Sequence, residues 1–399
     1  MQTELEVLSL LGRDRALFVR DLTAHQAELA EGIRGTSFLV LGGAGSIGQQ
    51  VVKAIFPYQP ARLHVVDVSE NNLVELVRDL RSSHGYIEGD FRTFPLNCGE
   101  PEFDAFWRST PPYDAVLNLT ALKHVRSERD PFTLMRMLHT NVLTTDKTLR
   151  QAIERGVSRY FAVSSDKAVN PANAMGASKR AMELCLMRAS DRIDVSSTRF
   201  ANVAFSDGSL LQGFVRRLAK RQPLAAPRDV RRYFITAEEA GRLCLLAAIL
   251  GRNRDSFIPI AGEDFAAIDF ITLADRFLRK QGYEPHPCAT EEEARHSVEA
   301  LAAEGKWPCF FAAGDTAGEK PVEEFAISGE TRDTGRFEEV DVICWQGLED
   351  EVALERFLAA MRQLRDRGRW SRDRLLDELK ALVPEFQHRE TGRFLDARM

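Results

Sequence analysis

The sequence contains no apolar run that approaches the length of a membrane-spanning helix, no internal repeat and no low-complexity tract. Its net charge of −6 gives no general reason to expect nucleic acid or an anionic membrane surface as a partner. The start of the chain carries acidic residues and lacks the basic segment of a secretory signal. We therefore expect a soluble, cytoplasmic protein that does not insert into a membrane.

Metal-binding and disulfide patterns are missing as well. The six cysteines are scattered without the close pairing of a metal site, so we expect reduced thiols and no bound metal. The 399 residues, 44% hydrophobic and 28% charged, are typical of an ordinary globular protein with one large or two smaller domains. Residues 2–34 are predicted to form a helical arm on the main domain. Residues 348–387 are predicted to form a charged helical addition for packing or subunit contact.

A glycine-rich turn follows the first predicted strand, Ser37 to Leu41. Glycines at 42, 45 and 48 lie between this strand and a predicted helix, which is the context in which such a pattern binds a dinucleotide. Glycine lets the backbone approach a pyrophosphate, and the helix N-terminus supplies donors. Asp67 ends the next predicted strand, 19 residues after Gly48, where a carboxylate binds a ribose 2′-hydroxyl. This carboxylate favours NAD over NADP; the alternative is a purely structural loop.

A second polar stretch follows a short apolar strand predicted at residues 160–163. Ser165, Asp166 and Lys167 leave the end of that strand, where open α/β sheets bind their ligands. A turn follows, and then a helix in which Met175 and Lys179, four residues apart, share one face. The alternative is a polar loop before an amphipathic helix, without a chemical role.

This layout resembles the active-site segment of the extended short-chain dehydrogenase/reductases. It is most similar to the nucleotide-sugar 4,6-dehydratases of bacterial polysaccharide biosynthesis, which carry Ser-Thr-Asp-Lys-Ala and then Met-Gly-Ala-Ser/Thr-Lys. Met175 stands where most of the superfamily has its catalytic tyrosine, as in one branch that acts on UDP-N-acetylglucosamine, and Ser165 replaces the threonine usual in that branch. Longer relatives carry membrane helices before a similar Leu-Leu-Gly-Arg stretch, and this chain is expected to be a soluble version.

The resemblance implies an α/β fold, a Rossmann-type doubly wound parallel sheet with a smaller C-terminal substrate-binding region and helical extensions at both ends. The expected units are an N-terminal helical arm (1–34), an NAD-binding domain (35–250) with a substrate segment at about 205–235, a substrate-binding region (251–347) and a C-terminal helical tail (348–399). Residues 285–345 are expected to be less regular.

The same resemblance implies roles for individual residues. The expected catalytic residues are Ser165, Asp166, Lys167, Met175 and Lys179. The expected NAD-binding residues are Gly42, Gly45, Ser46, Ile47, Gly48, Asp67, Ser69, Asp90, Phe91, Thr120, Ala121, Lys123, Asn141 and Lys179. The expected substrate-binding residues are Lys123, His124, Asn202, Ser209, Arg232 and Glu319. Asp90 is expected to meet the adenine, with an ordinary loop residue as the alternative, and Asn141 to brace the active-site backbone.

Removing water from a hexose across carbons 5 and 6 first requires a ketone at carbon 4, because only then is the carbon 5 proton acidic. By resemblance, Lys167 is the base for that proton and Asp166 is the acid for the leaving hydroxyl. An ordinary lysine has a pKa of about 10.4, so we expect burial and the nearby Lys179 to lower the pKa of Lys167. A thioether accepts no proton, so a water, Ser165 or Lys167 itself has to replace the missing tyrosine.

We therefore predict an NAD-dependent nucleotide-sugar 4,6-dehydratase for bacterial surface glycans, acting on UDP-N-acetylglucosamine or a GDP counterpart. An epimerase of the same fold is the alternative enzyme, since some 5-epimerases of this branch share the Asp-Lys pair and the methionine. A catalytically inactive NAD-binding sensor or scaffold is the alternative of another class. The lost tyrosine favours it, whereas Asp166, Lys167 and Lys179 oppose it. The resemblance also implies a homo-oligomer, a dimer or larger.

Overall fold

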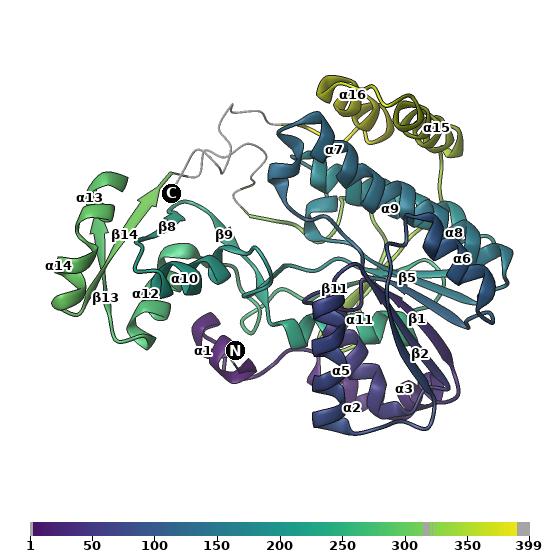
Figure 1. Cartoon of the computed structure of the whole chain (residues 1–399), viewed down its shortest axis with the longest axis horizontal. Helices are drawn as coiled ribbons and strands as arrows, with labels where there is room; N and C mark the ends of the chain where they lie inside the picture. The colour runs from purple at the N-terminus through teal and green to yellow at the C-terminus, as the bar shows by residue number, and fades with distance from the viewer. Residues whose placement is uncertain (1–2, 314–319, 321, 389–399) are drawn as a thin grey trace.

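The computed structural model describes residues 3–313, 320 and 322–388 of the chain. These residues form a larger and a smaller lobe that lie side by side in Figure 1, with the N-terminal helix α1 (Glu4–Leu11) beside the smaller one. In this part of the chain the larger lobe is built on a nine-stranded sheet and the smaller lobe on a three-stranded sheet. Each lobe encloses its own cluster of buried apolar side chains.

The large sheet is mostly parallel, with the strand order β15-β16-β11-β6-β5-β4-β1-β2-β3. The strands from β11 to β3 are parallel. At one edge β16 pairs antiparallel with β11, and β15 pairs antiparallel with β16. The chain order reverses between β1 and β4, so their carboxyl ends border the crevice in which such sheets bind ligands. The predicted Rossmann-type α/β fold is thereby confirmed. The strands are β1 (Ser37–Leu41), β2 (Arg62–Asp67), β3 (Asp90–Pro95), β4 (Ala115–Asn118), β5 (Arg159–Val163), β6 (Asp194–Thr198), β11 (Asp255–Pro259), β15 (Arg332–Asp333) and β16 (Val340–Cys344).

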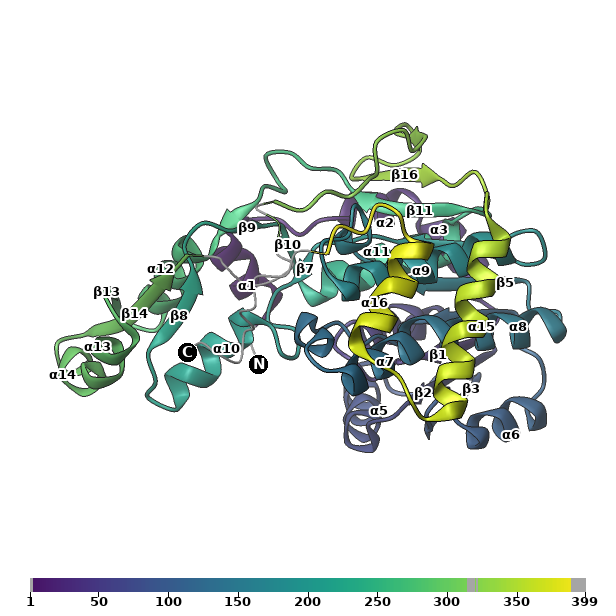
Figure 2. The ribbon, with the colours of Figure 1, turned by 90° about the horizontal axis from the view of Figure 1, so that it is seen from above.

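Helices cover both faces of this sheet, which is why strands such as β1 read as unbroken apolar runs. α3, α4 and α11 pack together on one face, and α7, α8 and α9 lie on the other (Figure 1). α15 and α16 form a further layer over α7 and α9, as Figure 2 shows from above. The helices of this lobe are α2 (Val19–Ala24), α3 (Gln26–Ile33), α4 (Gly48–Ile55), α5 (Glu70–His84), α6 (Pro101–Ser109), α7 (Pro131–Leu138), α8 (Thr144–Glu154), α9 (Ala174–Ala189), α11 (Ala237–Leu250), α15 (Glu351–Arg367) and α16 (Arg372–Leu382).

The smaller lobe has three parallel strands in the order β13-β14-β8, and its helices pack against them. Two pairs of short strands, β7 with β10 and β9 with β12, complete the described strands. The strands are β7 (Asn202–Val203), β8 (Leu224–Pro227), β9 (Arg231–Arg232), β10 (Phe234–Ile235), β12 (Ile268–Asp269), β13 (Glu284–Cys288) and β14 (Lys306–Ala312), and the helices are α10 (Leu210–Ala219), α12 (Phe270–Lys280), α13 (Glu291–His296) and α14 (Val298–Ala303).

The domain boundary predicted at residue 250 does not match the structure. β11, β15 and β16 follow it in the chain, yet they complete the large sheet. The smaller lobe collects α10 and β8, from the predicted substrate segment, together with β13, β14 and the helices between them. β16 pairs with β11 over five residues, so part of the region expected to be less regular is a sheet strand. The sequence of a short apolar run does not predict which edge of which sheet the strand will join.

The N-terminal arm contacts both lobes rather than the main domain alone. α1 ends at Gly12, whose φ of 77° is the left-handed conformation that glycine adopts readily. α1 buries Val7, Leu10 and Leu11 in the core of the smaller lobe, while α3 packs on α11 in the larger lobe. Within the described residues, no helix has both the length and the apolar character needed to cross a membrane.

Candidate active site

The glycine-rich turn lies at the carboxyl end of β1, inside the crevice. Gly42 has a φ of 72°, and a Cβ at Gly48 would lie 2.2 Å from the carbonyl oxygen of Gly42, so neither position tolerates a side chain without rearrangement. Asp67 ends β2, and its carboxylate accepts hydrogen bonds from the backbone N–H of Ala44 (3.0 Å) and of Ser69 (2.9 Å). The turn is thus a tight backbone cradle that is tied to a carboxylate at the next strand end.

A cavity of about 550 Å³ opens beside this turn. Five of the predicted NAD-binding residues line it: Gly42, Gly45, Asp67, Thr120 and Ala121. Sequence reasoning missed two further groups in its wall. One is Leu96, Asn97 and Cys98, which follow β3, and the other is Arg365 and Trp370, at the end of α15 and in the turn before α16. The C-terminal helical layer therefore reaches the same cavity as the glycine-rich turn.

The structure contradicts the prediction that Asp90 meets the adenine and that Phe91 binds NAD. Asp90 begins β3 and lies opposite Arg62 at the start of β2, at the end of the sheet away from Asp67. Its carboxylate contacts Nε2 of His64 at 3.1 Å, and Phe91 packs edge-on against Phe56. The motif match placed the strand end too early, because β3 continues to Pro95 and the residues after it reach the cavity.

Asn141 and Ser46 contact the protein rather than the cavity. The side chain of Asn141 bonds both the N–H (2.8 Å) and the C=O (3.0 Å) of Leu122 and donates to Oγ of Ser178 (2.9 Å). It joins the loop after β4 to α9. Ser46 contacts Oδ2 of Asp207 through its hydroxyl at 3.1 Å, which ties the glycine-rich turn to the loop before α10. Ile47, Gly48, Ser69 and Lys123 also lie outside the lining of this cavity.

The predicted acid–base pair lies just after β5, in the 3-10 turn η4 (Asp166–Ala168). Asp166 is buried, and its Oδ1 accepts from the hydroxyl of Ser165 (2.7 Å) and from Nζ of Lys167 (3.3 Å). A Cβ at Gly176 would lie 2.2 Å from the carbonyl oxygen of Lys167, so the first turn of α9 packs directly on this pair. Backbone packing therefore determines where the two side chains point.

Met175 and Lys179 are both buried on α9. Nζ of Lys179 donates to the carbonyl oxygen of Val163 at the end of β5 (2.8 Å) and lies 3.9 Å from the sulfur of Met182. Burial lowers the pKa of Lys179 to about 8, against the opposing charge of Glu183. Met175 belongs to the main apolar core and offers no proton-accepting group.

The expected lowering of the pKa of Lys167 is wrong for the structure without ligand. Burial acts in that direction, but the carboxylates of Asp166 and Glu323 outweigh it and raise the pKa of Lys167 above its usual range. The opposing cation is Arg232, not Lys179. Glu323, whose Oε1 is 3.7 Å from Nζ of Lys167, was missed by sequence reasoning although its Gly-Glu-Lys-Pro-Val-Glu-Glu segment resembles a family motif.

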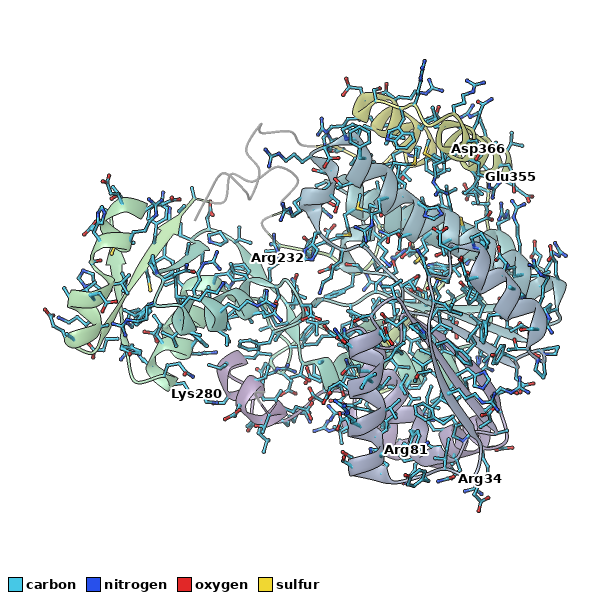
Figure 3. The ribbon with its side chains drawn as sticks, viewed as in Figure 1. Arg34, Arg81, Arg232, Lys280, Glu355 and Asp366 are labelled. Atoms are coloured by element: carbon cyan, nitrogen blue, oxygen red, sulfur yellow. The ribbon has the colours of Figure 1, made fainter. Side chains whose placement is uncertain are left out.

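The predicted substrate-binding residues come from both sides of the crevice. Lys123 donates to Oγ of Ser206 (3.1 Å), and the ring of His124 lies against Gly208, where a Cβ would be 2.3 Å from it. Arg232 lies between the two lobes in Figure 3; it is buried and donates to the carbonyl oxygen of Lys320 (2.8 Å). The remaining three are Asn202, which is half-buried near Tyr233, Ser209, which caps α10, and Glu319, which lies outside the described residues.

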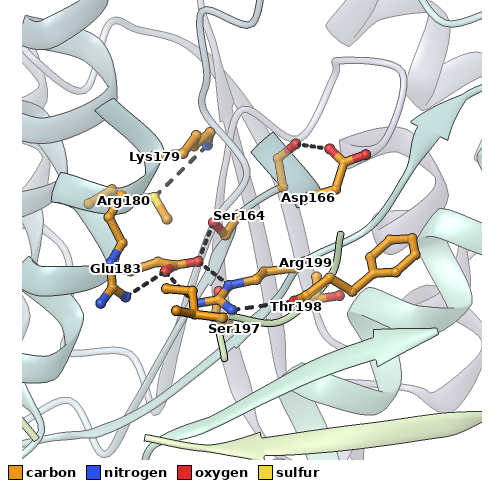
Figure 4. A network of polar contacts seen from close by, with 12 residues as sticks. Ser164, Asp166, Lys179, Arg180, Glu183, Ser197, Thr198 and Arg199 are labelled. Atoms are coloured by element: carbon orange, nitrogen blue, oxygen red, sulfur yellow. Dashed lines mark hydrogen bonds and ion pairs between the residues drawn. The ribbon is translucent and has the colours of Figure 1, made fainter. Parts of the chain in front are cut away.

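Beneath the pair in Figure 4, an ion network centred on the fully buried Arg199 and Glu183 joins the ends of β5 and β6 to α9. The guanidinium of Arg199 bonds both carboxylate oxygens of Glu183, at 2.7 and 2.8 Å, and also bonds Glu330. Oε1 of Glu183 further accepts from the hydroxyl of Ser164 at 2.6 Å. This network holds the carboxyl end of β5, from which the acid–base pair projects.

The fold, and the position of Lys179 on the helix beside the glycine-rich crevice, place the chain among the extended short-chain dehydrogenase/reductases. The model of the polysaccharide biosynthesis protein family matches residues 38–344, and the chain belongs to that family.

The similar proteins include polysaccharide biosynthesis proteins, 4,6-dehydratases and 4-epimerases. The chain is 30% identical over 279 residues to the probable polysaccharide biosynthesis protein EpsC of Bacillus subtilis, covering 69% of this chain and 44% of EpsC. It is 28% identical over 235 residues to a UDP-N-acetylglucosamine 4,6-dehydratase (inverting) of Campylobacter jejuni, covering 56% of this chain and 67% of that protein. It is 31% identical over 173 residues to a UDP-glucose 4-epimerase of Rickettsia canadensis, covering 42% and 50%. The chain thus spans about half the length of the first of these relatives.

Among solved structures, the chain resembles a dTDP-glucose 4,6-dehydratase from Streptomyces venezuelae crystallised with NAD and TYD bound. The TM-score is 0.57, and the match covers 84% of this chain and 98% of that one. With 19% sequence identity, this likeness establishes the shared fold.

Proposed function

We propose that the protein is an NAD-dependent nucleotide-sugar 4,6-dehydratase of surface glycan biosynthesis. The observation that carries the proposal is the adjacent acid and base, Asp166 and Lys167, held 3.3 Å apart at the carboxyl end of β5 in the ligand-binding crevice. A simple binding protein has no need of a buried carboxylate beside a half-buried lysine at this place. The named dehydratase among the relatives supports the same reaction.

The residues of the crevice fit NAD. The backbone cradle at Gly42 and Gly48 suits a pyrophosphate at the start of α4, and Asp67 suits a ribose diol. When bound, NAD supplies the hydride acceptor that turns the carbon 4 alcohol into a ketone. The proton of the carbon 4 hydroxyl leaves through Ser165 or a water. Lys167 in its neutral form then removes the carbon 5 proton, and Asp166 in its protonated form gives its proton to the departing 6-hydroxyl, which leaves as water. Lys179, anchored on Val163, holds positive charge near the reacting end of the crevice when it is protonated.

NAD is expected to bind more tightly than NADP. A 2′-phosphate on the adenosine ribose would meet the carboxylate of Asp67, and the exposed Val68 beside it offers no positive charge. Calorimetric titration of the purified protein with both dinucleotides measures the preference. Asp67→Asn should reduce the preference for NAD, because it weakens the binding of NAD and removes the repulsion between the carboxylate and the 2′-phosphate of NADP. Tighter binding of NADP to the native chain would overturn the assignment.

Trp370 is expected to contribute to NAD binding, because it closes one side of the same cavity. Its indole N–H donates to the carbonyl oxygen of Pro131 (2.8 Å). Its ring lies edge-on to the ring of Phe132, with 6.3 Å between the ring centroids and an interplanar angle of 66°. Trp370→Ala should raise the Kd for NAD about tenfold, the scale of losing one aromatic wall against a base. Trp370→Phe should restore most of the affinity, and Arg369→Ala, next to it but outside the cavity, should change little. An unaltered Kd for Trp370→Ala would leave the C-terminal helices a packing role only.

The function itself is tested with a panel of UDP- and GDP-hexoses, starting with UDP-N-acetylglucosamine. We expect loss of one water by mass spectrometry, and transfer of a deuterium label from carbon 4 of the substrate to carbon 6 of the product. Return of the label to carbon 4 with inversion would favour an epimerase, the second candidate, which the Rickettsia relative supports.

We also propose that the protein self-associates, and sedimentation of the purified chain tests this.

A further inference from the structure

Glu323 places a second carboxylate against the acid–base pair. It lies in the described segment after β14, and only 5% of its surface is exposed. Its Oε1 is 3.7 Å from Nζ of Lys167 and 4.0 Å from Nε of Arg232, and its Oε2 is 3.8 Å from Nζ of Lys320. The ammonium of Lys167 is therefore shared between Glu323, on the loop from the smaller lobe, and Asp166, on η4.

Two buried oxygens of this cluster lack a hydrogen-bond partner among the described residues: Oδ2 of Asp166 and Oε2 of Glu323. A buried carboxylate oxygen without a donor is costly, so such atoms are usually satisfied by a ligand, by water or by a proton. Burial raises the pKa of Glu323, with Asp166 acting in the same direction and Lys167, Arg232 and Lys320 opposing it. Glu323 is thus a carboxylate that takes up a proton more readily than an ordinary glutamate.

This arrangement bears on how Lys167 becomes a base. The carboxylates of Asp166 and Glu323 hold the pKa of Lys167 above its usual range against burial, so Lys167 is held as an ammonium, which removes no proton from carbon. A nucleotide sugar that fills the crevice displaces water, and loss of water disfavours every charged form. A proton passing from Nζ of Lys167 to Glu323 converts an ammonium and a carboxylate into an amine and a carboxylic acid. One N–H bond breaks, one O–H bond forms and no electrons are exchanged.

We propose that Glu323 is the positioning residue that receives the proton of Lys167 when substrate closes the site, so that Lys167 acts as a base at neutral pH. The proposal rests on the dehydratase function proposed above. The gap of 3.7 Å exceeds a charge-assisted hydrogen bond by about 1 Å, a distance that a side-chain adjustment covers. Asp166 is the competing acceptor. As the acid for the leaving hydroxyl, Asp166 has to carry a proton of its own, which it takes from solvent as the site closes, so the proton of Lys167 goes to Glu323.

The two possible acceptors of the proton, Glu323 and Asp166, predict opposite changes in the rate of dehydration at pH 7 for Glu323→Gln. If Glu323 receives the proton, the variant must lose that proton to bulk solvent. Dehydration at pH 7 should then fall at least tenfold and recover about tenfold per pH unit as the pH rises toward the pKa of Lys167. If Glu323 acts only as a neighbouring charge, its removal should lower the pKa of Lys167 and leave the rate at pH 7 equal or higher, which would overturn the proposal.

Two further variants serve as controls. Glu324→Gln makes the same charge change one residue away, on an exposed carboxylate that faces Asn170, and should leave the pH profile unaltered. Glu323→Asp keeps the acid and should restore part of the neutral-pH rate. The thermal unfolding midpoint of each variant shows that it has folded.

A measurement without substrate separates this inference from the proposed function. The pH dependence of acetic anhydride labelling of Lys167, followed by mass spectrometry, reports the pKa of its amine. In either role of Glu323, Glu323→Gln should lower that pKa by about 1–3 units, the effect of losing one carboxylate at this distance. The labelling curve therefore tests the coupling on which the proposal depends, whereas the rate at pH 7 tests whether Glu323 receives the proton. An unchanged labelling curve means that Glu323 is not coupled to Lys167. The native chain could also fail to dehydrate any nucleotide hexose while Glu323→Gln still shifts the labelling curve. That result would contradict the dehydratase function and support the coupling between Glu323 and Lys167.

Discussion

Lys167→Ala is expected to lower the rate of water loss from the nucleotide sugar by about 10²–10⁴-fold, the usual contribution of a general base. The reason is geometric: Lys167 is the amine next to Asp166 at the strand end, whereas the buried Lys179 is bound to the backbone of Val163. Asp166→Asn should cause a loss of the same order, because it leaves the departing hydroxyl without its acid. Product formation is measured by mass spectrometry at a fixed pH.

Oxidation at carbon 4 should depend less on these two residues. Each variant should therefore accumulate bound NADH, visible by its absorbance, together with a 4-keto sugar that still carries its 6-hydroxyl. Lys220→Ala, an exposed lysine at the end of α10, serves as the control and should behave as the native chain. Equal loss of oxidation and of dehydration in Lys167→Ala would mean that the residue shapes the whole site rather than acting in the elimination.

Glu183→Gln is expected to destabilise the fold by about 3 kcal/mol, in the range for breaking a buried ion pair from one side. Arg199 has no exposed surface and bonds both oxygens of Glu183, so the neutral amide leaves part of a guanidinium charge uncompensated inside the protein. Urea unfolding, followed by circular dichroism, measures the loss. Glu299→Gln breaks the exposed pair between Glu299 and Arg221 and should change stability little.

The same pair predicts a pH dependence. Burial opposes the charge of Glu183, but Arg199 and Arg180 outweigh it and hold the pKa of Glu183 below its usual range. A carboxyl whose pKa is lower in the folded state contributes stability above its unfolded pKa of about 4.3, and that stability is lost as the pH falls through the folded value. The native chain should thus lose stability more steeply below about pH 4 than Glu183→Gln does. Parallel acid-unfolding curves would contradict this role for the pair.

Much of the site was predictable because its signals are local in the chain. The glycine spacing, the strand before it and Asp67 after the next strand constrain the backbone within a single βαβ unit. Ser165, Asp166 and Lys167 were placed at a strand end from the apolar run before them, and the structure has them there. Asp90 shows the limit of this reasoning, because an error of a few residues in a strand end moves a side chain to the opposite end of the strands.

The sequence by itself determined the Rossmann-type fold, the family and the residues that leave the ends of β1, β2 and β5, since these depend on local spacing and on the periodicity of apolar residues. Only the tertiary structure decided which distant segments meet there. Three contacts near the site join residues more than a hundred positions apart in the chain: Glu323 with Lys167, Trp370 with Pro131, and Glu330 with Arg199. The charge state of Lys167 was also decided at that level, because desolvation and the nearest carboxylates together set a pKa, and neither is written in the order of the chain.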